Sequence, residues 1–125
     1  MRKIRISAGK ISATAVLKEN GTANAIWDAL PMEASGNTWG EEIYFGIPVQ
    51  VPQAKDASDL VNLGDIAYWP PGHAFCIFFG RTPASQGSEC RAASAVNVFG
   101  QIEGDPKVFK QVRHGEKVRL EKFEG

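Results

Sequence analysis

The sequence predicts a mainly β domain, a closed β-barrel capped by two short α-helices. Apolar and polar residues alternate with a period of two along much of the chain, turn signals separate these stretches, and only two segments have helical spacing. The order of two strands, a helix, several strands, a second helix and a last strand suits a closed barrel. The 125 residues fit one domain, residues 1–125.

The first elements are predicted to be a hairpin and a helix. Residues 2–8 and 11–17 alternate on either side of a glycine turn, as in a β-hairpin. Thr22 is expected to cap the helix because its hydroxyl can accept from a first-turn amide, and Pro31 should end it. The expected apolar face of this helix consists of Ala23, Ile26, Trp27 and Leu30.

The middle of the chain contains an alternating stretch after an irregular segment, residues 33–40. Residues 43–51 alternate cleanly, but Pro48 and Pro52 lack the amide that a central strand donates. We therefore expect an edge or bulged strand, which could form a homodimer although the prolines argue against simple edge pairing. Residues 56–60 are expected to form one helical turn.

The second half is predicted to be strands with one helix. Residues 81–91 are polar and typical of a surface loop. Asp105, followed by Pro106, predicts the start of a second short helix. Residues 75–79 are apolar at every position, which favours a strand covered on both faces. The predicted strands are residues 66–69, 74–79, 95–102 and 117–123.

Composition excludes several classes of partner and cofactor. Lys plus Arg and Asp plus Glu number 14 each, so no net charge attracts nucleic acid or anionic lipid. The longest uncharged run, residues 66–80, is shorter than the ~20 apolar residues of a membrane span. Cys76 and Cys90 lack clustered ligands, so no metal or cofactor is expected and both should be reduced thiols. We expect a soluble, cytoplasmic protein.

The candidate ligand-binding residues come mainly from an aromatic-rich part of the chain. Trp39, Tyr68 and Trp69 flank predicted loops and combine a large apolar body with a polar group. Glu42 could accept hydrogen bonds in a cleft, whereas paired-carboxylate catalysis with Glu41 is disfavoured because successive strand residues point opposite ways. The whole candidate set is Trp39, Glu42, Tyr44, Tyr68, Trp69, His73, Phe78, Phe79 and Asn97.

Two polar candidates have structural alternatives. His73 could act as a general base, but no nucleophile is placed beside it, and a loop histidine facing water is the other interpretation. Asn97 interrupts an apolar strand, so its side chain must find partners, either in the backbone or in a ligand. No catalytic residue is assigned.

Several stretches of the sequence resemble cyclophilins. Residues 64–68 with residues 75–83 are similar to the cyclophilin stretch that ends in a Phe-Phe strand, and residues 95–102 look like the strand before the last helix. A further resemblance is to small prokaryotic cyclophilin-like proteins of unassigned function, carried by residues 37–45, 64–72 and 94–98. The resemblance spans nearly the whole chain and implies a cyclophilin-like β-barrel, in which Phe78 or Phe79 would floor a groove.

The sequence departs from cyclophilin isomerases at their catalytic arginine. Those enzymes carry a Phe-His-Arg motif, but the equivalent residues 42–51 contain neither His nor Arg. Isomerisation faces a barrier of ~18–20 kcal/mol, and losing one preorganised donor costs ~3 kcal/mol or more. We therefore expect an aromatic-lined cleft that binds a small molecule or an extended, proline-containing peptide without isomerase catalysis.

Two alternative functions stay open, so whether the protein is an enzyme is undecided. The first is an atypical prolyl isomerase that uses other donors, such as Gln50, Trp39 or Asn97. The second is an accessory subunit of an amide-hydrolysing assembly, since relatives of the cyclophilin fold occur in such assemblies.

Overall fold

Antiparallel strands account for most of the chain in the computed structural model, which describes residues 2–124. One α-helix, α1 (Gly21–Asp28), and two 3-10 helices, η1 (Pro70–Gly72) and η2 (Pro106–Gln111), connect them. The strands are β1 (Lys3–Ala8), β2 (Ile11–Leu17), β3 (Met32–Ser35), β4 (Asn37–Thr38), β5 (Glu42–Gly46), β6 (Ser58–Val61), β7 (Asp65–Trp69), β8 (Ala74–Phe78), β9 (Cys90–Ile102) and β10 (Lys117–Phe123).

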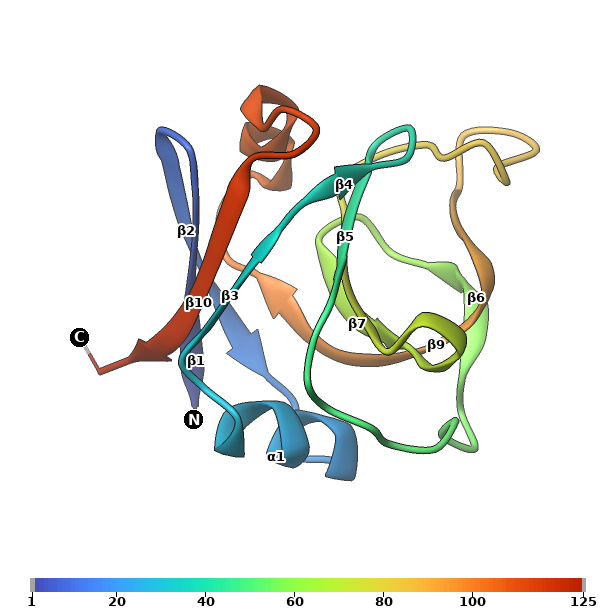
Figure 1. The fold of residues 1–125 in the computed structure, drawn as a ribbon. Coiled ribbons are helices and arrows are strands. Elements are labelled where there is room, and N and C mark those ends of the chain that lie inside the picture. The colour runs from blue at the N-terminus through green and yellow to red at the C-terminus, as the bar shows by residue number, and fades with distance from the viewer. Residues whose placement is uncertain (1, 125) are drawn as a thin grey trace.

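The strands form a single curved path, seen in Figure 1. Its order is β3-β10-β1-β2-β9-β7-β8-β5-β4, and β6 pairs separately with β9. The two ends of the path, β3 and β4, are consecutive in the chain and flank Gly36. The mainly β, antiparallel fold class is thus confirmed, but hydrogen bonds between the described strands do not close the sheet into a barrel.

Gly36 explains how one short segment serves both ends of the sheet. Before it β3 pairs with β10, and after it β4 pairs with β5. A Cβ at Gly36 would lie 3.1 Å from a Val118 methyl and 3.3 Å from an Ile43 methyl. The chain therefore passes between β10 and β5 in a space that has little room for a side chain, and it changes partner there instead of continuing one ladder.

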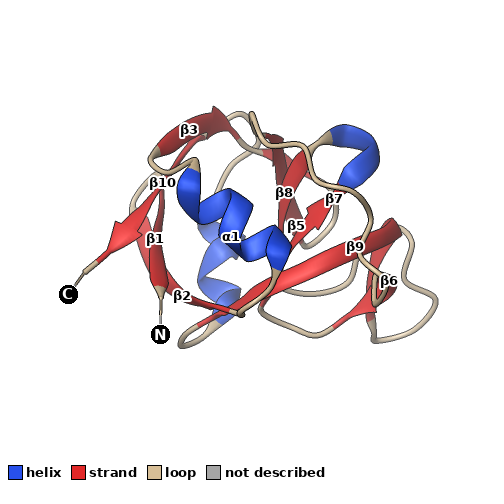
Figure 2. Cartoon of the chain, turned by 90° about the horizontal axis from the view of Figure 1, so that it is seen from below, coloured by secondary structure: helices blue, strands red, loops and turns tan. Residues whose placement is uncertain are grey.

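The N-terminal hairpin and helix are confirmed, with one correction at the helix cap. The side chain of Asn20, not that of Thr22, accepts from the Ala23 amide at 2.9 Å, because Asn20 is extended and Thr22 already lies within α1. The Thr22 hydroxyl instead accepts a hydrogen bond from Asn97 at 3.1 Å. Figure 2 shows α1 lying across one side of the sheet. Two of its own residues, Ala23 and Ile26, are buried.

The predictions for the middle of the chain need several corrections. The irregular segment 33–40 contains most of β3 and all of β4. The strand expected over residues 43–51 is shorter, because β5 ends at Gly46. It pairs with β4 on one side and β8 on the other and is therefore not at an edge. Alternation still places Ile47 in the core, but Pro48 has no amide to donate and the ladder ends at Gly46.

Three more predictions, for residues 56–60, Cys90 and the second helix, are wrong. Residues 56–60 form no helical turn, because residues 58–61 pair with β9 as β6. Cys90 is buried and begins β9 instead of lying in a polar loop. The second helix is the 3-10 helix η2 and not an α-helix.

Within residues 2–124, no helix has both the length and the hydropathy that crossing a membrane requires.

Strands β7 and β8 are buried on both faces, as the uninterrupted apolar run of residues 75–79 predicted for β8. One face belongs to what we call the main core, where Phe75 stacks on Phe45 at 5.1 Å and meets Phe99 edge-on at 5.2 Å between ring centroids. The other face forms a smaller second core against β6 and β9. The buried residues of this second core are Val61, Ala67, Ala74, Cys76, Phe78, Cys90, Ala92 and Val96.

Candidate functional site

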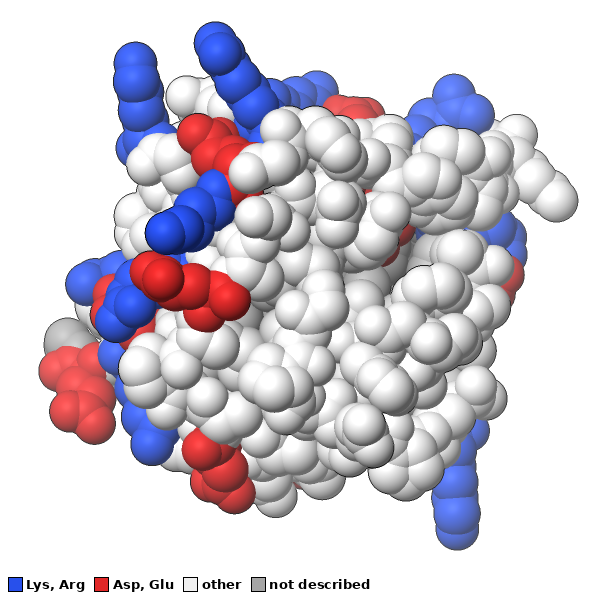
Figure 3. Space-filling view, viewed as in Figure 1, with Lys and Arg blue, Asp and Glu red and all other residues white. Residues whose placement is uncertain are grey.

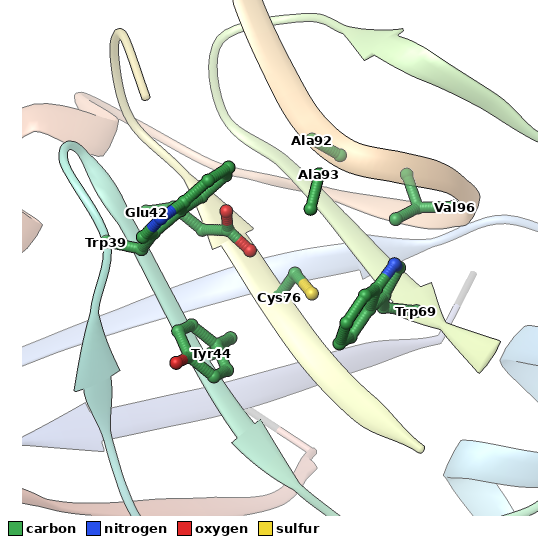
Figure 4. A pocket seen from close by; sticks show the side chains of 8 residues that line it. All are labelled: Trp39, Glu42, Tyr44, Trp69, Cys76, Ala92, Ala93 and Val96. Carbon is green, nitrogen blue, oxygen red and sulfur yellow. The ribbon is translucent and has the colours of Figure 1, made fainter. Parts of the chain in front are cut away.

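A cavity of about 240 Å³ lies on the second-core side of the sheet. Figure 3 shows the face of the molecule seen in Figure 1: charged side chains gather mainly toward its margins and leave a wide uncharged area that is hollowed. Figure 4 shows the cavity from close by. Its lining residues come from the β4–β5 turn and from four strands, and they are Trp39, Glu42, Tyr44, Trp69, Cys76, Ala92, Ala93 and Val96.

Side chains alternate between the two faces along β5, and this alternation determines which of them line the cavity. Ile43 and Phe45 point into the main core, so Glu42 and Tyr44 point to the opposite face. In the pairing of β5 with β8, Tyr44 lies directly opposite Cys76. One strand pair therefore supplies a carboxyl, a phenol and a thiol to the same wall.

An irregularity in β9 shapes the opposite wall. Ser58 of β6 pairs with Val96, whereas Leu60 pairs with Arg91, so residues 92–95 of β9 face a single residue of β6. Such a bulge re-aims side chains beside a site. The small side chains of Ala92 and Ala93 line the cavity at this point and leave its space open.

Hydrogen bonds hold the indole of Trp69 and the backbone of Trp39. The Trp69 indole nitrogen donates to the Ser94 hydroxyl at 2.7 Å, which joins β7 to the β9 bulge. The Trp39 backbone amide donates to the Glu42 carbonyl at 2.9 Å, which fixes the turn before β5. In Figure 4 the two indoles stand on opposite sides of the Glu42 carboxyl and the Cys76 sulfur.

Glu42 is a buried carboxyl that faces this space. Its side chain is only 5% exposed, and burial raises its pKa to about 7, while a hydrogen bond from the Cys76 thiol acts in the opposite direction. Burial and the nearby Glu42 charge raise the pKa of Cys76 well above its ordinary value, so this thiol is a poor nucleophile. Near neutral pH the Glu42 carboxyl can accept a hydrogen bond, donate one or exchange a proton.

Glu41 and Glu42 point in different directions, as predicted from strand geometry. Glu41 pairs with Lys110 at 3.2 Å, away from the cavity. Among the ion pairs of residues 2–124 none involves Glu42. No group of three or more His, Cys, Asp or Glu side chains within residues 2–124 could hold a metal ion.

Three predicted aromatic residues lie outside the cavity lining. Tyr68 is fully buried in the main core, where its hydroxyl donates to the Val49 carbonyl at 2.6 Å. Phe78 is fully buried in the second core. Phe79 is buried against Phe109, with 6.2 Å between the ring centroids.

The two polar candidates also lie outside the lining. His73 is exposed at the end of η1, where its backbone adopts the left-handed conformation with φ 47°. The Asn97 side chain is held by protein groups: its oxygen accepts from the Ala54 amide at 2.8 Å, and its amide donates to Thr22 and to the Pro52 carbonyl at 3.0 Å. These contacts give Asn97 the structural role that was one of its two interpretations.

The structure thus gathers Trp39, Glu42, Tyr44 and Trp69 from the predicted set. Sequence reasoning missed four other lining residues. Cys76 carried a signal, because its strand alternates and its face could be matched to that of Tyr44. The other three are small or aliphatic residues in or next to the bulge, whose position depends on pairing with a distant strand: Ala92, Ala93 and Val96.

Comparison with known proteins identifies one family, and the similar solved structures include those of AF2241 and McbB. Residues 2–121 match the family described as Cyclophilin-like. The solution structure of the hypothetical protein AF2241 from Archaeoglobus fulgidus is 42% identical, covers 98% of this chain and 95% of its own, and has a TM-score of 0.83. No curated protein matches the chain.

The second similar structure shares the fold alone. It is described as McbB in complex with tryptophan, and it has a TM-score of 0.70 at 16% identity. The match covers 98% of this chain but 45% of the McbB chain, so this protein spans less than half of the McbB length.

Proposed function

Because the chain belongs to the Cyclophilin-like family, we propose that it is a binding module of this fold, which holds a small molecule in the cavity between Trp39 and Trp69. The observation that carries the proposal is a buried carboxyl, Glu42, facing an otherwise mainly apolar, aromatic cavity. Pockets that bind small molecules have this character: apolar walls with few placed polar groups that orient the ligand.

The size of the cavity supports a compact ligand over an extended peptide. Its volume of about 240 Å³ lies just below the ~300–1,000 Å³ of drug-sized pockets. The Trp69–Ser94 hydrogen bond bridges β7 and the β9 bulge beside it, which favours a bounded pocket over an open groove.

The charges around the cavity support binding without isomerase catalysis. Among its lining residues there is no Arg, Lys or His. Arg91, the arginine nearest in sequence to the bulge, pairs with Asp59 at 3.0 Å and Glu89 at 3.1 Å. A prolyl isomerase needs a preorganised donor at the twisted amide, and this cavity has no positively charged side chain among its lining residues to take the place of the cyclophilin arginine.

A ligand screen on matched variants tests the proposed binding site. Ala93 is exposed at the cavity, so Ala93→Leu should fill it, whereas Ala84→Leu makes the same change in the loop between β8 and β9. We expect some small metabolites to raise the melting temperature of the wild type and of Ala84→Leu, but not of Ala93→Leu. Ligands that stabilise all three proteins equally would contradict this site, and stabilisation by no ligand would contradict the proposed function.

A protease-coupled assay with proline-containing peptides tests the second half of the proposal. We expect cis–trans rates equal to the uncatalysed background at any protein concentration. A rate that rises with protein concentration and falls in Ala93→Leu would instead assign isomerase activity to this cavity.

A further inference from the structure

We propose that the ligand of this cavity is a compact organic cation, an alkylammonium or quaternary ammonium group held between the two indole rings and against the Glu42 carboxylate. The inference rests on the proposed binding function and adds the chemical class of the ligand. It follows from three observations: a carboxylate without an ion-pair partner, aromatic rings without an internal cation, and hydrogen bonds that hold the Trp69 indole and the backbone turn that carries Trp39.

The first observation is the charge of Glu42. A buried carboxylate is costly unless it is paired. All ion pairs of residues 2–124 involve other carboxylates, including the adjacent Glu41, which meets Lys110 at 3.2 Å. The oxygens of Glu42 point into the cavity in Figure 4. A cationic ligand would supply the missing partner at the place where the carboxylate is already directed.

The second observation is how this protein treats its tryptophans. Trp27 has two internal cations over its ring, Arg2 at 5.3 Å and Lys122 at 4.9 Å from the centroid. Among the described residues, the cation–π contacts involve Trp27 and Phe123 and leave Trp39 and Trp69 without one. Tryptophan faces are the strongest aromatic sites for cations, and aromatic cages bind quaternary ammonium groups. The two cavity tryptophans are therefore available to a cation from outside.

The third observation is that the site is organised before a ligand arrives. The Trp69 indole is held by Ser94 at 2.7 Å, and the turn that carries Trp39 is tied to the Glu42 carbonyl at 2.9 Å. Side chains that are already fixed lose little conformational entropy on binding. The cavity volume of about 240 Å³ fits an ammonium group with a short apolar body.

Binding of a cation should depend on pH through Glu42. The other titratable side chains facing it are Tyr44 on its own strand and Cys76 on β8, while β7, β9 and the Trp39 turn contribute none to the lining. The cation needs the ionised carboxylate, whose pKa lies at about 7. The ionised fraction, and with it the apparent affinity, should rise about tenfold between pH 6 and pH 8.

The experiment compares a cation with its neutral isostere by tryptophan fluorescence titration and calorimetry on the whole chain. The probes are choline, its neutral isostere 3,3-dimethylbutan-1-ol, and n-butylammonium. We expect choline or n-butylammonium to bind the wild type about tenfold or more tightly than the isostere. Glu42→Gln should reduce this preference to the part that the indole rings supply without weakening the isostere, and Trp27→Phe should leave choline binding unchanged.

Two outcomes would overturn the inference and are distinguishable from failure of the proposed function. If the isostere binds as tightly as both cations, the cavity binds ligands but does not select a cation. If neither cation binds while other compounds stabilise the wild type and not Ala93→Leu, the ligand class is wrong and the binding site stands. The wild-type comparison of choline with its isostere decides the question even if a variant fails to fold.

Discussion

The two faces of β7 and β8 use the same strands for different purposes. On the main-core face, Phe75 packs against two other rings, and the one buried hydroxyl, that of Tyr68, donates to a carbonyl at 2.6 Å. On the second-core face three neighbouring residues are small, namely Ala67, Ala74 and Cys76. Beside them lies a cavity of about 240 Å³ that is lined by Glu42, a carboxyl whose pKa is raised by burial. Adjacent residues thus divide between filling a core and leaving a binding space, and mutations on the two faces should differ in kind.

Phe75→Ala should have the largest effect, because it removes a ring at the centre of the main core. We expect a loss of about 3–5 kcal/mol in the free energy of unfolding, from lost burial and the cavity left behind. Urea denaturation followed by circular dichroism measures it. The matched change is Cys76→Ala, the next residue on the opposite face, with an expected loss of about 1 kcal/mol. Equal losses would break the contrast between the faces.

Glu42→Gln should change the pH dependence of stability. The pKa of Glu42 is about 7 in the folded protein against 4.5 ordinarily. A carboxyl whose pKa is raised on folding stabilises below the unfolded value and loses that contribution as pH rises through the folded one. At about 1.36 kcal/mol per pH unit, the wild type should lose about 3 kcal/mol between pH 4.5 and pH 8, and Glu42→Gln should not.

Urea denaturation at several pH values checks this expectation. The variant should match the wild type near pH 4.5 and exceed its stability by up to about 3 kcal/mol at pH 8. Burial also raises the pKa of Asp65, so a smaller slope of the same sign should persist in the variant. Parallel curves for the two proteins would mean that Glu42 is not desolvated.

Tyr68→Phe should destabilise the protein without affecting the cavity. The change deletes the donor to the Val49 carbonyl and leaves a buried acceptor unpaired, which costs about 1–2 kcal/mol. Ligands found for the wild type should bind the variant with the same affinity. A change in affinity would place Tyr68 in the binding site after all, as its sequence context first indicated.

Ala93→Leu should have the smallest effect on stability and the clearest effect on binding. Ala93 is exposed at the cavity mouth, so the free energy of unfolding should stay within about 0.5 kcal/mol of the wild type. Ligand affinity should be lost, as measured by calorimetry with any compound that binds the wild type. A large loss of stability would show that the added side chain disturbs the second core instead of filling the cavity.

Local patterns were sufficient for much of the fold and for part of the site. Period-two alternation predicted β1 and β2, and residues 75–79, apolar at every position, predicted that β8 is a strand covered on both faces. Trp39 and Trp69 could be selected because large aromatic residues that flank loops and carry a polar group suit a binding site, and Glu42 because a carboxyl can accept hydrogen bonds in a cleft. In each case the signal lies within a few residues of the feature.

The missed features depend on partners far away in the chain. β6 was mistaken for a helical turn because four residues carry little periodicity, and only pairing with β9 makes them a strand. The hydrogen bonds of the Asn97 side chain with Ala54 and Thr22 could not be predicted, because both partners are far from Asn97 in the sequence. The β9 bulge, which opens the cavity, is a mismatch between two strands and is not a property of either sequence alone.

The place of β10 in the sheet affects how the protein is made. β10 follows every other described strand in the chain, yet it lies between β3 and β1, pairing with both. While a ribosome is still synthesising the chain, both of these strands therefore wait with unpaired edges, which invite association with other chains. Folding of this domain should finish only once residues 117–123 have emerged, so the nascent domain is most in need of chaperones between the synthesis of β3 and that of β10.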